Sequence, residues 1–234
     1  MAFIHSPNIV TDGLILAIDA ADKNCFVSGN TTCTNLVTGG LLTGASGTPG
    51  SGTHTPNTGN FPAYSSLNGG IFNFSGGKGM NCEENLGTTT TSSICMWFYA
   101  AASDTEYLTD GRNDGGSWFL SNYTDYNINW HDTLQYNFEN PYNASASDFI
   151  NKWLHMVVTS DSSGSKIYIN SVQKTATGTS SADEDFGINY RIGTRYTSSH
   201  QWTGYMGPIN FYNKALSAKE VSQNFNAQRS RFGV

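Results

Sequence analysis

The chain has 234 residues, a formal net charge of −6 and only 13% charged residues, and its 25 glycines are spread among many Ser, Thr and Asn residues. This composition is typical of many short strands joined by turns, so we expect an all-β protein that is large enough to bury a sizeable core. Nucleic acids and anionic membranes attract clustered Lys and Arg, so the thin spread of 12 basic residues argues against both kinds of partner.

The N-terminal segment, residues 1–7, has neither the basic start nor the long apolar core of a secretory signal peptide. No stretch of the sequence stays apolar over the roughly 18 residues that a membrane-spanning helix needs. We therefore expect a chain without a signal peptide and without membrane insertion.

The first expected strand covers residues 13–20, where apolar side chains occupy both alternating sets of positions, as in a strand covered on both faces. From residue 35 to residue 68 the sequence is rich in Gly, Ser, Thr, Pro and Asn and poor in aliphatic residues. We expect an ordered excursion of about 35–68 over the surface. A disordered linker between two domains is the alternative, but the residues before it are too few to form a domain, so residues 1–234 are expected to be a single domain.

Four cysteines, Cys25, Cys33, Cys82 and Cys95, could pair in three ways. Without a signal peptide we expect reduced thiols, although Cys25 and Cys33 bracket a turn-rich segment and could close a short loop in oxidising surroundings. No Cys-x-x-Cys or His-x-x-x-His spacing predicts a zinc site.

Later strands are expected at spacings of roughly ten residues, each bounded by Asn, Asp, Gly or Ser. The segment 92–100 has apolar or aromatic side chains on both faces and should lie centrally in a sheet. The remaining expected strands are 71–74, 106–108, 118–120, 127–130, 152–159, 166–170, 191–193 and 204–212. So many short strands imply a two-sheet sandwich.

A single helix is expected near the C-terminus. Ser217 and Glu220 have the spacing of a capping box, and Val221 and Phe225 place apolar side chains on one face. This helix should pack on the body made by the strands.

In this order the segments resemble the laminin G-like domains of the concanavalin A-like lectin/glucanase superfamily, in the form found in phage virion proteins and bacterial surface proteins. The resemblance spans nearly the whole chain and rests on residues 13–21, 72–76, 93–97, 153–159, 166–170 and 204–232. It implies an antiparallel jelly-roll sandwich of two curved sheets with one short C-terminal helix.

Hydrolytic members of this superfamily place two Glu and one Asp alternately along one strand, so that the three carboxylates face a cleft. This chain has no such run: Glu83 and Glu84 are adjacent and would point to opposite faces, and residues 183–185 lack a flanking strand pattern. Retaining glycoside hydrolysis needs two carboxyl groups about 5 Å apart. We therefore expect no enzymatic activity.

Sugar-binding sites combine flat aromatic faces with polar side chains that bond to hydroxyl groups. Aromatic residues at expected strand ends, together with their polar neighbours, are the candidates for a carbohydrate site: Trp118, Trp130, His131, Arg195, Tyr196 and Trp202. The alternative is that these aromatics pack at the rim or in a subunit interface. Trp97 and Trp153 lie inside strong strand patterns and are expected in the core.

The resemblance also implies a possible calcium ion, because laminin G-like domains often hold Ca²⁺ at one rim through oxygen ligands. Asp110 and Asp114, in an acidic segment that ends in Gly115, are the candidate ligands. Arg112 stands where a further ligand would be wanted, so a solvated turn is the alternative. No cofactor is expected to be required.

Together these features predict a non-enzymatic protein of a virion surface, a capsid or tail decoration protein that binds carbohydrate of a host or environmental surface. Its partners would be that glycan and either other virion proteins or further copies of itself. The alternative is a purely structural assembly protein that binds no glycan, and a glycoside hydrolase or lyase is less favoured.

Overall fold

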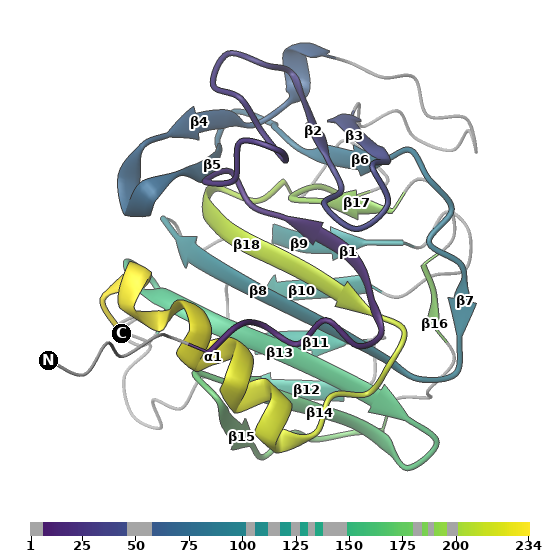
Figure 1. Cartoon of the computed structure of the whole chain (residues 1–234). Helices are drawn as coiled ribbons and strands as arrows, with labels where there is room; N and C mark the ends of the chain where they lie inside the picture. The colour runs from purple at the N-terminus through teal and green to yellow at the C-terminus, as the bar shows by residue number, and fades with distance from the viewer. Residues whose placement is uncertain are drawn as a thin grey trace, which may run out of the picture.

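The computed structural model describes residues 7–45, 58–101, 106–111, 118–122, 127–130, 134–137, 149–179, 184–186, 190–195 and 201–234. Within these residues the chain forms two eight-stranded sheets, a two-stranded pair and one long helix. The sheets lie face to face, and the helix crosses the outer face of one of them (Figure 1). The predicted fold class, an all-β antiparallel sandwich with one C-terminal helix, is confirmed.

The sheet that carries the helix, sheet A, is built around two long strands whose residues are almost all buried. One face of these strands meets the other sheet and much of the other face meets the helix, which is why both alternating sets of side chains are apolar. The strand order is β15 (Val172–Lys174), β14 (Gly164–Ile169), β13 (Trp153–Asp161), β8 (Ser92–Ala100), β18 (Gly204–Tyr212), β5 (Ile71–Phe74) and β4 (Ala63–Ser65), and β1 (Leu14–Ile18) pairs with β18.

The opposite sheet, sheet B, consists of shorter strands. Its order is β12 (Leu134–Asn137), β11 (Asn127–Trp130), β10 (Trp118–Asn122), β9 (Glu106–Asp110), β17 (Arg191–Ile192), β6 (Met80–Cys82), β3 (Leu41–Gly44) and β2 (Thr32–Thr34). Two short strands, β7 (Thr88–Thr89) and β16 (Glu184–Asp185), pair with each other, and two 3₁₀ turns, η1 (Thr58–Asn60) and η2 (Leu67–Gly69), precede β4 and β5.

The main core fills the space between the two sheets. Alternate residues of each strand point into it, such as Met96 and Phe98 of β8 facing Leu108 of β9 and Ile192 of β17. Two smaller apolar clusters lie on the outer face of sheet A, beneath the helix.

The helix α1 (Ala218–Phe232) begins at the predicted capping box, in which the Ser217 hydroxyl accepts from the Glu220 N–H and the Glu220 carboxylate accepts from the Ser217 N–H. It ends at Gly233, whose positive φ of 69° suits glycine. The described part of the chain contains no helix with the length and hydropathy needed to cross a membrane.

The structure of residues 35–68 differs from the predicted surface excursion. This segment contributes β3 to sheet B and β4 to sheet A, and it places Leu42 and Phe61 in the main core. The prediction of a surface excursion is therefore wrong for these residues: the segment pairs along its backbone in both sheets, and its few apolar side chains are enough to reach the core. Residues 46–57 lie outside the described residues.

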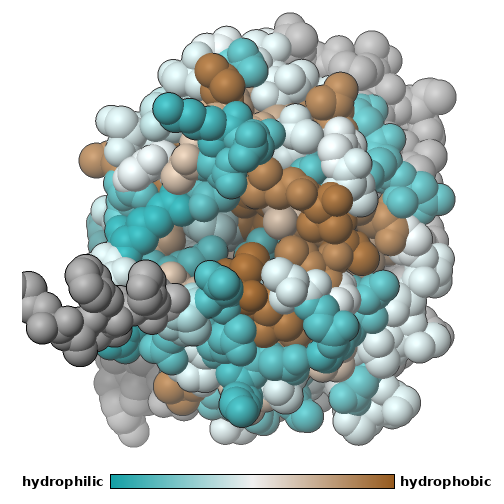
Figure 2. Space-filling model, in the orientation of Figure 1, coloured by the Kyte–Doolittle hydropathy of each residue, from teal (hydrophilic) through white to brown (hydrophobic). Residues whose placement is uncertain are grey.

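An apolar patch marks the helix-bearing face near β1. The Leu36 N–H bonds to the Ala17 carbonyl, which places Leu36 and Val37, 39% and 44% exposed, beside this strand. The space-filling view of the same face shows hydrophobic residues gathered over β1 and along the helix, surrounded by polar surface (Figure 2).

Candidate functional site

Two of the predicted sugar-binding residues, Trp130 and Trp202, are completely buried. On β11, Trp130 shares the inward face with Ile128, and Trp202 packs edge-on against Phe98 with ring centroids 5.6 Å apart. Neither indole can present a ring face to a sugar, so their prediction as part of an exposed platform is wrong. Polar neighbours in the sequence suggested strand-end exposure. Strand alternation turns the Trp130 ring into the core, and Trp202, which precedes β18, packs in the same core.

The other predicted sugar-binding residues are only partly described. Arg195 is half-buried, and its guanidinium carbon lies 5.4 Å from the centroid of the Tyr107 ring. The backbone of Trp118 belongs to β10, directly opposite Asp110 of β9. The side chain of Trp118 and the residues His131 and Tyr196 lie outside what the structure describes, so their roles stay predictions.

A row of polar side chains crosses the outward face of sheet B. Thr43, Asn81, Arg191 and Asp110 pair in succession across β3, β6, β17 and β9, and each of them is at least nine-tenths buried. They alternate with the core residues Met80, Cys82 and Ile192, which assigns them to the face away from the core. We call these four residues the polar row.

Hydrogen bonds hold one end of the polar row. The Thr43 hydroxyl donates to the Glu83 carboxylate, which also accepts from the Asn81 amide at 3.2 Å. At the other end, Asp110 lies opposite Arg191, so the neighbour of this carboxylate is a cation rather than a second carboxyl group.

The calcium site is not shown. Arg191, a cation rather than an oxygen ligand, is the residue paired with Asp110 across β17 and β9. Among the described residues no group of three or more His, Cys, Asp or Glu side chains could hold a metal ion. Asp114 lies outside these residues, so the calcium ligands stay a prediction.

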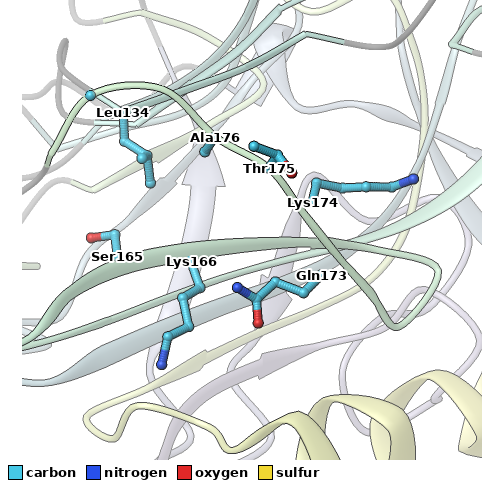
Figure 3. A pocket seen from close by; sticks show the side chains of 8 residues that line it. Leu134, Ser165, Lys166, Gln173, Lys174, Thr175 and Ala176 are labelled. Atoms are coloured by element: carbon cyan, nitrogen blue, oxygen red, sulfur yellow. The ribbon is translucent and has the colours of Figure 1, made fainter.

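A hollow of about 400 Å³ lies at one edge of the sandwich, between the β14–β15 hairpin and β12. The close view shows Leu134 and Ala176 on one side and Ser165 and Lys166 on the other (Figure 3). The described residues that line it include no aromatic side chain, so it lacks the stacking surface that a sugar ring prefers.

The outward face of sheet A carries a row of aromatic side chains that reach solvent. Trp153 of β13 pairs with Tyr99 of β8, Tyr99 with Tyr205 of β18, and Tyr205 with Asn73 of β5. All four side chains are partly exposed. Directly paired residues of antiparallel strands point to the same face, so Trp153, Tyr99 and Tyr205 form one line across three strands. We call these three residues the aromatic row.

Ring geometry within the aromatic row is regular. The centroids of Trp153 and Tyr99 are 5.7 Å apart, and so are those of Tyr99 and Tyr205. The ring planes are inclined by 55° in the first pair and by 62° in the second. The surface is therefore a twisted line of rings rather than a flat platform.

The end of the helix sets the boundary of the aromatic row. Phe232, in the last turn of α1, stacks on Trp97 at 4.3 Å between centroids and contacts Trp153 at 4.6 Å. A Cβ at Gly207 would lie 2.6 Å from Phe232, so this glycine allows the helix to approach β18 closely. Trp97 and His155 are buried beneath the helix, and the row lies just past its end.

Polar groups border the aromatic row. The Tyr99 hydroxyl donates to Asn151 Oδ1 at 3.3 Å, and Asn73 continues the line beyond Tyr205. Amide groups of this kind can both donate to and accept from sugar hydroxyls. The row thus combines apolar ring faces with neutral polar partners.

Sequence reasoning missed this surface. Trp97 lies in the core as predicted, but Trp153 does not, because its side chain is partly exposed at the start of β13. The available signal was an aromatic residue near one end of each of three expected strands. Their alignment depends on strand order and register, which the sequence alone does not provide.

A family model of laminin G type, described as the concanavalin A-like lectin/glucanases superfamily, matches residues 74–222, which is more than half of the chain. The chain belongs to this superfamily. Among curated protein sequences no relative was found to match.

Several solved structures share the fold. Domain 4 of AbnA, a GH43 extracellular arabinanase from Geobacillus stearothermophilus, in complex with arabinotriose, has a TM-score of 0.60 and 18% identity, with 90% of this chain and 97% of that chain covered. The binding domain of Paraclostridial Mosquitocidal Protein 1 has a TM-score of 0.62 and 13% identity, with 92% and 52% covered. The binding domain of botulinum neurotoxin serotype D has a TM-score of 0.60 and 15% identity, with 93% and 51% covered.

These identities are low, so the likeness shows the fold alone. This chain spans about half the length of the two toxin binding domains and nearly all of the arabinanase domain.

Proposed function

We propose that the protein is a non-enzymatic carbohydrate-binding protein whose sugar-binding surface is the aromatic row. The observation that carries this proposal is the alignment of three partly exposed aromatic rings across adjacent strands, bordered by Asn73 and Asn151. Aromatic faces stack on the C–H surfaces of sugar rings, and neutral amides bond to the hydroxyl groups. The sugar-bound relative with the same fold adds support, because this fold accommodates such ligands elsewhere.

The proposal of a non-enzymatic role has its own support. Glycoside hydrolysis uses a pair of carboxyl groups on either side of the scissile bond. In the polar row the group opposite Asp110 is the guanidinium side chain of Arg191. The residue paired with Asp110 on β17 is therefore a cation and cannot serve as the second carboxyl group.

The proposed setting is the surface of a virion, where the protein would decorate a capsid or a tail. Support for this part comes from the resemblance of the strand order to laminin G-like domains of phage virion proteins. Its partners would then be other virion proteins or further copies of the chain, in addition to a glycan.

A glycan array with the purified protein, followed by titration with the best glycan, tests the carbohydrate role. Tyr205→Ala removes one ring of the row and should weaken binding about tenfold, the change that corresponds to about 1.4 kcal/mol. Tyr64→Ala is the matched control, because Tyr64 is 36% exposed but lies on β4 outside the row. Absence of binding to any glycan, or equal loss in both variants, would refute the proposal.

A purely structural assembly role is the second candidate, and the apolar patch beside β1 favours it. Exposed apolar surface often marks a contact with another protein. The patch adjoins the last residues of β18, whereas the aromatic row crosses the first residues of that strand, so the two surfaces can be changed separately. If Val37→Asp lowers the mass of the assembly in light scattering while Tyr205→Ala leaves it unchanged, the patch is the interface.

A further inference from the structure

We infer that the aromatic row selects linear, neutral glycans that form an extended ribbon with threefold screw symmetry, and that it binds inner segments of such chains. The inference rests on the proposed function and names the class of carbohydrate. Four features of the aromatic row support it: the spacing of the rings, their inclination, the room at both ends and the lack of charge on the residues of the row.

The spacing of the row matches an extended sugar chain. Neighbouring strands lie about 4.8 Å apart, and consecutive ring centroids of the row are 5.7 Å apart. An extended, β-1,4-linked pyranose chain advances by a similar length for each sugar. If the glycan ran across the sheet, each of its sugars would therefore lie over one strand. A compact or widely coiled glycan would have a different advance per sugar, so only its first sugar would lie over a ring.

The inclination of the rings distinguishes between extended chains. Successive sugar planes of a flat, twofold ribbon such as cellulose are parallel, so such a chain cannot stack on rings inclined by 55° and 62°. In a threefold ribbon such as xylan each sugar turns by one third of a revolution relative to the last. Neighbouring sugar planes are then inclined by an angle close to the two that separate Trp153, Tyr99 and Tyr205.

In the described part of the chain, no further strand pairs beyond β4 at one end of the row or directly beside Trp153 at the other. Beyond Tyr205 the line continues through Asn73 to Ala63, a small exposed residue on the edge strand β4. At the other end, Trp153 precedes the part of β13 that pairs with β14, because that pairing covers only Met156 to Asp161. Among the described residues, the sheet leaves a glycan chain room to run past both ends, which favours binding of inner segments over recognition of a chain terminus.

The members of the line carry no charge. Trp153, Tyr99, Tyr205, Asn73 and Ala63 are all neutral, and the group bonded to the Tyr99 hydroxyl is the Asn151 amide. Binding of a uronic acid or a sulfated sugar would require a cation along the line itself. The row is therefore suited to neutral hydroxyl-rich chains.

Titration calorimetry with hexasaccharides of three geometries tests the inference: β-1,4-linked xylose for the threefold ribbon, β-1,4-linked glucose for the flat ribbon and β-1,3-linked glucose for the wide helix. We expect the xylose chain to bind at least tenfold more tightly than the other two. Affinity should rise with length from two to four sugars, and modification of the reducing end should leave it unchanged.

Variants locate the binding. Tyr205→Ala and Tyr99→Ala should each weaken xylohexaose binding about tenfold, while Tyr64→Ala should bind like the unchanged protein. Trp153→Phe keeps a ring against Phe232 and serves where Trp153→Ala fails to fold; it should weaken binding by a smaller factor. Thermal unfolding of each variant confirms that the fold persists.

The outcomes separate the two proposals. Equal or tighter binding of the glucose chains, or loss of binding when the reducing end is modified, overturns the inference and leaves the carbohydrate-binding role standing. Binding of the xylose chain that is unaffected by Tyr205→Ala and Tyr99→Ala overturns the assignment of this ligand to the row. Binding of no glycan in this set or on an array overturns the inference and the proposed function together.

Discussion

The tryptophan side chains of this protein differ in what they contact rather than in the residues beside them in the sequence. Trp97, Trp130 and Trp202 are completely buried, whereas Trp153 is partly exposed next to the end of the helix. Each buried indole fills space, between the sheets for Trp130 and Trp202 and beneath the helix for Trp97, so its removal leaves a cavity. A partly exposed ring leaves a smaller void and has a face that can contact a ligand.

Trp202→Ala and Tyr205→Ala should therefore separate stability from binding. Truncation of the buried Trp202 should lower the free energy of unfolding by about 3–5 kcal/mol, the usual cost of such a cavity. Tyr205→Ala should lower it by about 1 kcal/mol and act mainly on glycan affinity. Urea unfolding measures both, and equal destabilisation by the two variants would contradict their assigned environments.

His155 is a second residue whose role follows from its surroundings. It is buried beneath the helix, 5.0 Å from the Trp97 ring and 5.8 Å from the Phe225 ring. Burial lowers the pKa of His155 from its ordinary value of 6.5 to about 3. The folded protein therefore holds this imidazole neutral at any pH above about 3.

This shift predicts a loss of stability in acid. Below pH 6.5 the unfolded chain binds a proton at His155 that the folded protein does not bind, so stability falls from pH 6.5 down to about 3. Between pH 6.5 and 4.5 the loss should be about 2 kcal/mol. His155→Leu removes this contribution while the carboxyl groups still titrate, so urea unfolding at the two pH values should show a smaller difference in the variant. An unchanged difference would show that His155 is not the group responsible.

At the scale of elements, one arginine joins the C-terminal helix to two distant parts of sheet A. The Arg231 guanidinium donates to both Asp19 oxygens, at 2.6 and 2.9 Å, and to the carbonyl groups of Asn68 and Gly70. The Asn68 amide donates back to the Arg231 carbonyl at 2.7 Å. The last turn of α1, the end of β1 and the turn η2 are thus held by a single side chain.

Arg231→Ala should lower the free energy of unfolding by about 2 kcal/mol, because it leaves a partly buried Asp19 without its partner. Arg231→Lys should recover only part of the lost free energy of unfolding, since an ammonium group cannot reproduce the two parallel hydrogen bonds to the Asp19 carboxylate. Arg229→Ala is the control: Arg229 is exposed in the same turn, and its loss should cost about 0.5 kcal/mol or less. Hydrogen exchange at residues 67–70 should increase in the Arg231 variants alone; a similar rise in Arg229→Ala would refute the link.

On the scale of the whole molecule, the two outer faces of the sandwich differ in character. The outer face of sheet B carries the buried polar row, and that of sheet A carries the helix and the exposed aromatic row. The sequence predicts the sandwich well, since the alternation in residues 92–100 and 152–159 and the capping box at Ser217 are local signals that fold as expected.

What the sequence does not predict is which residues become neighbours across strands. Tyr99 and Tyr205 lie side by side only because β8 and β18 are adjacent and in a particular register. Trp153 is exposed because the helix ends before covering it, and Leu42 is buried because β3 pairs with β6. Strand order, register and the reach of the helix are properties of the assembled fold, so local patterns alone could not identify the aromatic row.

The four cysteines provide a measure of the integrity of the whole molecule, because all of them are free and buried. Burial raises the pKa of Cys82 and of Cys95 to about 12, whereas a hydrogen bond with the Cys33 thiol lowers the pKa of Cys25. An alkylating reagent should react slowly with the native protein, first at Cys25, and with all four thiols after unfolding in guanidinium. Mass spectrometry of the labelled peptides checks the order, and rapid native labelling of Cys95 would contradict the packing beneath the helix.

The position of Phe232 against Trp153 has a practical consequence for anyone who attaches this protein to something else. Gly233 and Val234 follow directly, and Val234 is exposed. A tag, a fused domain or a solid surface joined at Val234 would therefore lie close to Trp153 at one end of the aromatic row. Attachment through this end would shield the rings from a long polymer. The geometry of tethering would thus decide whether a displayed copy of the protein can reach its glycan.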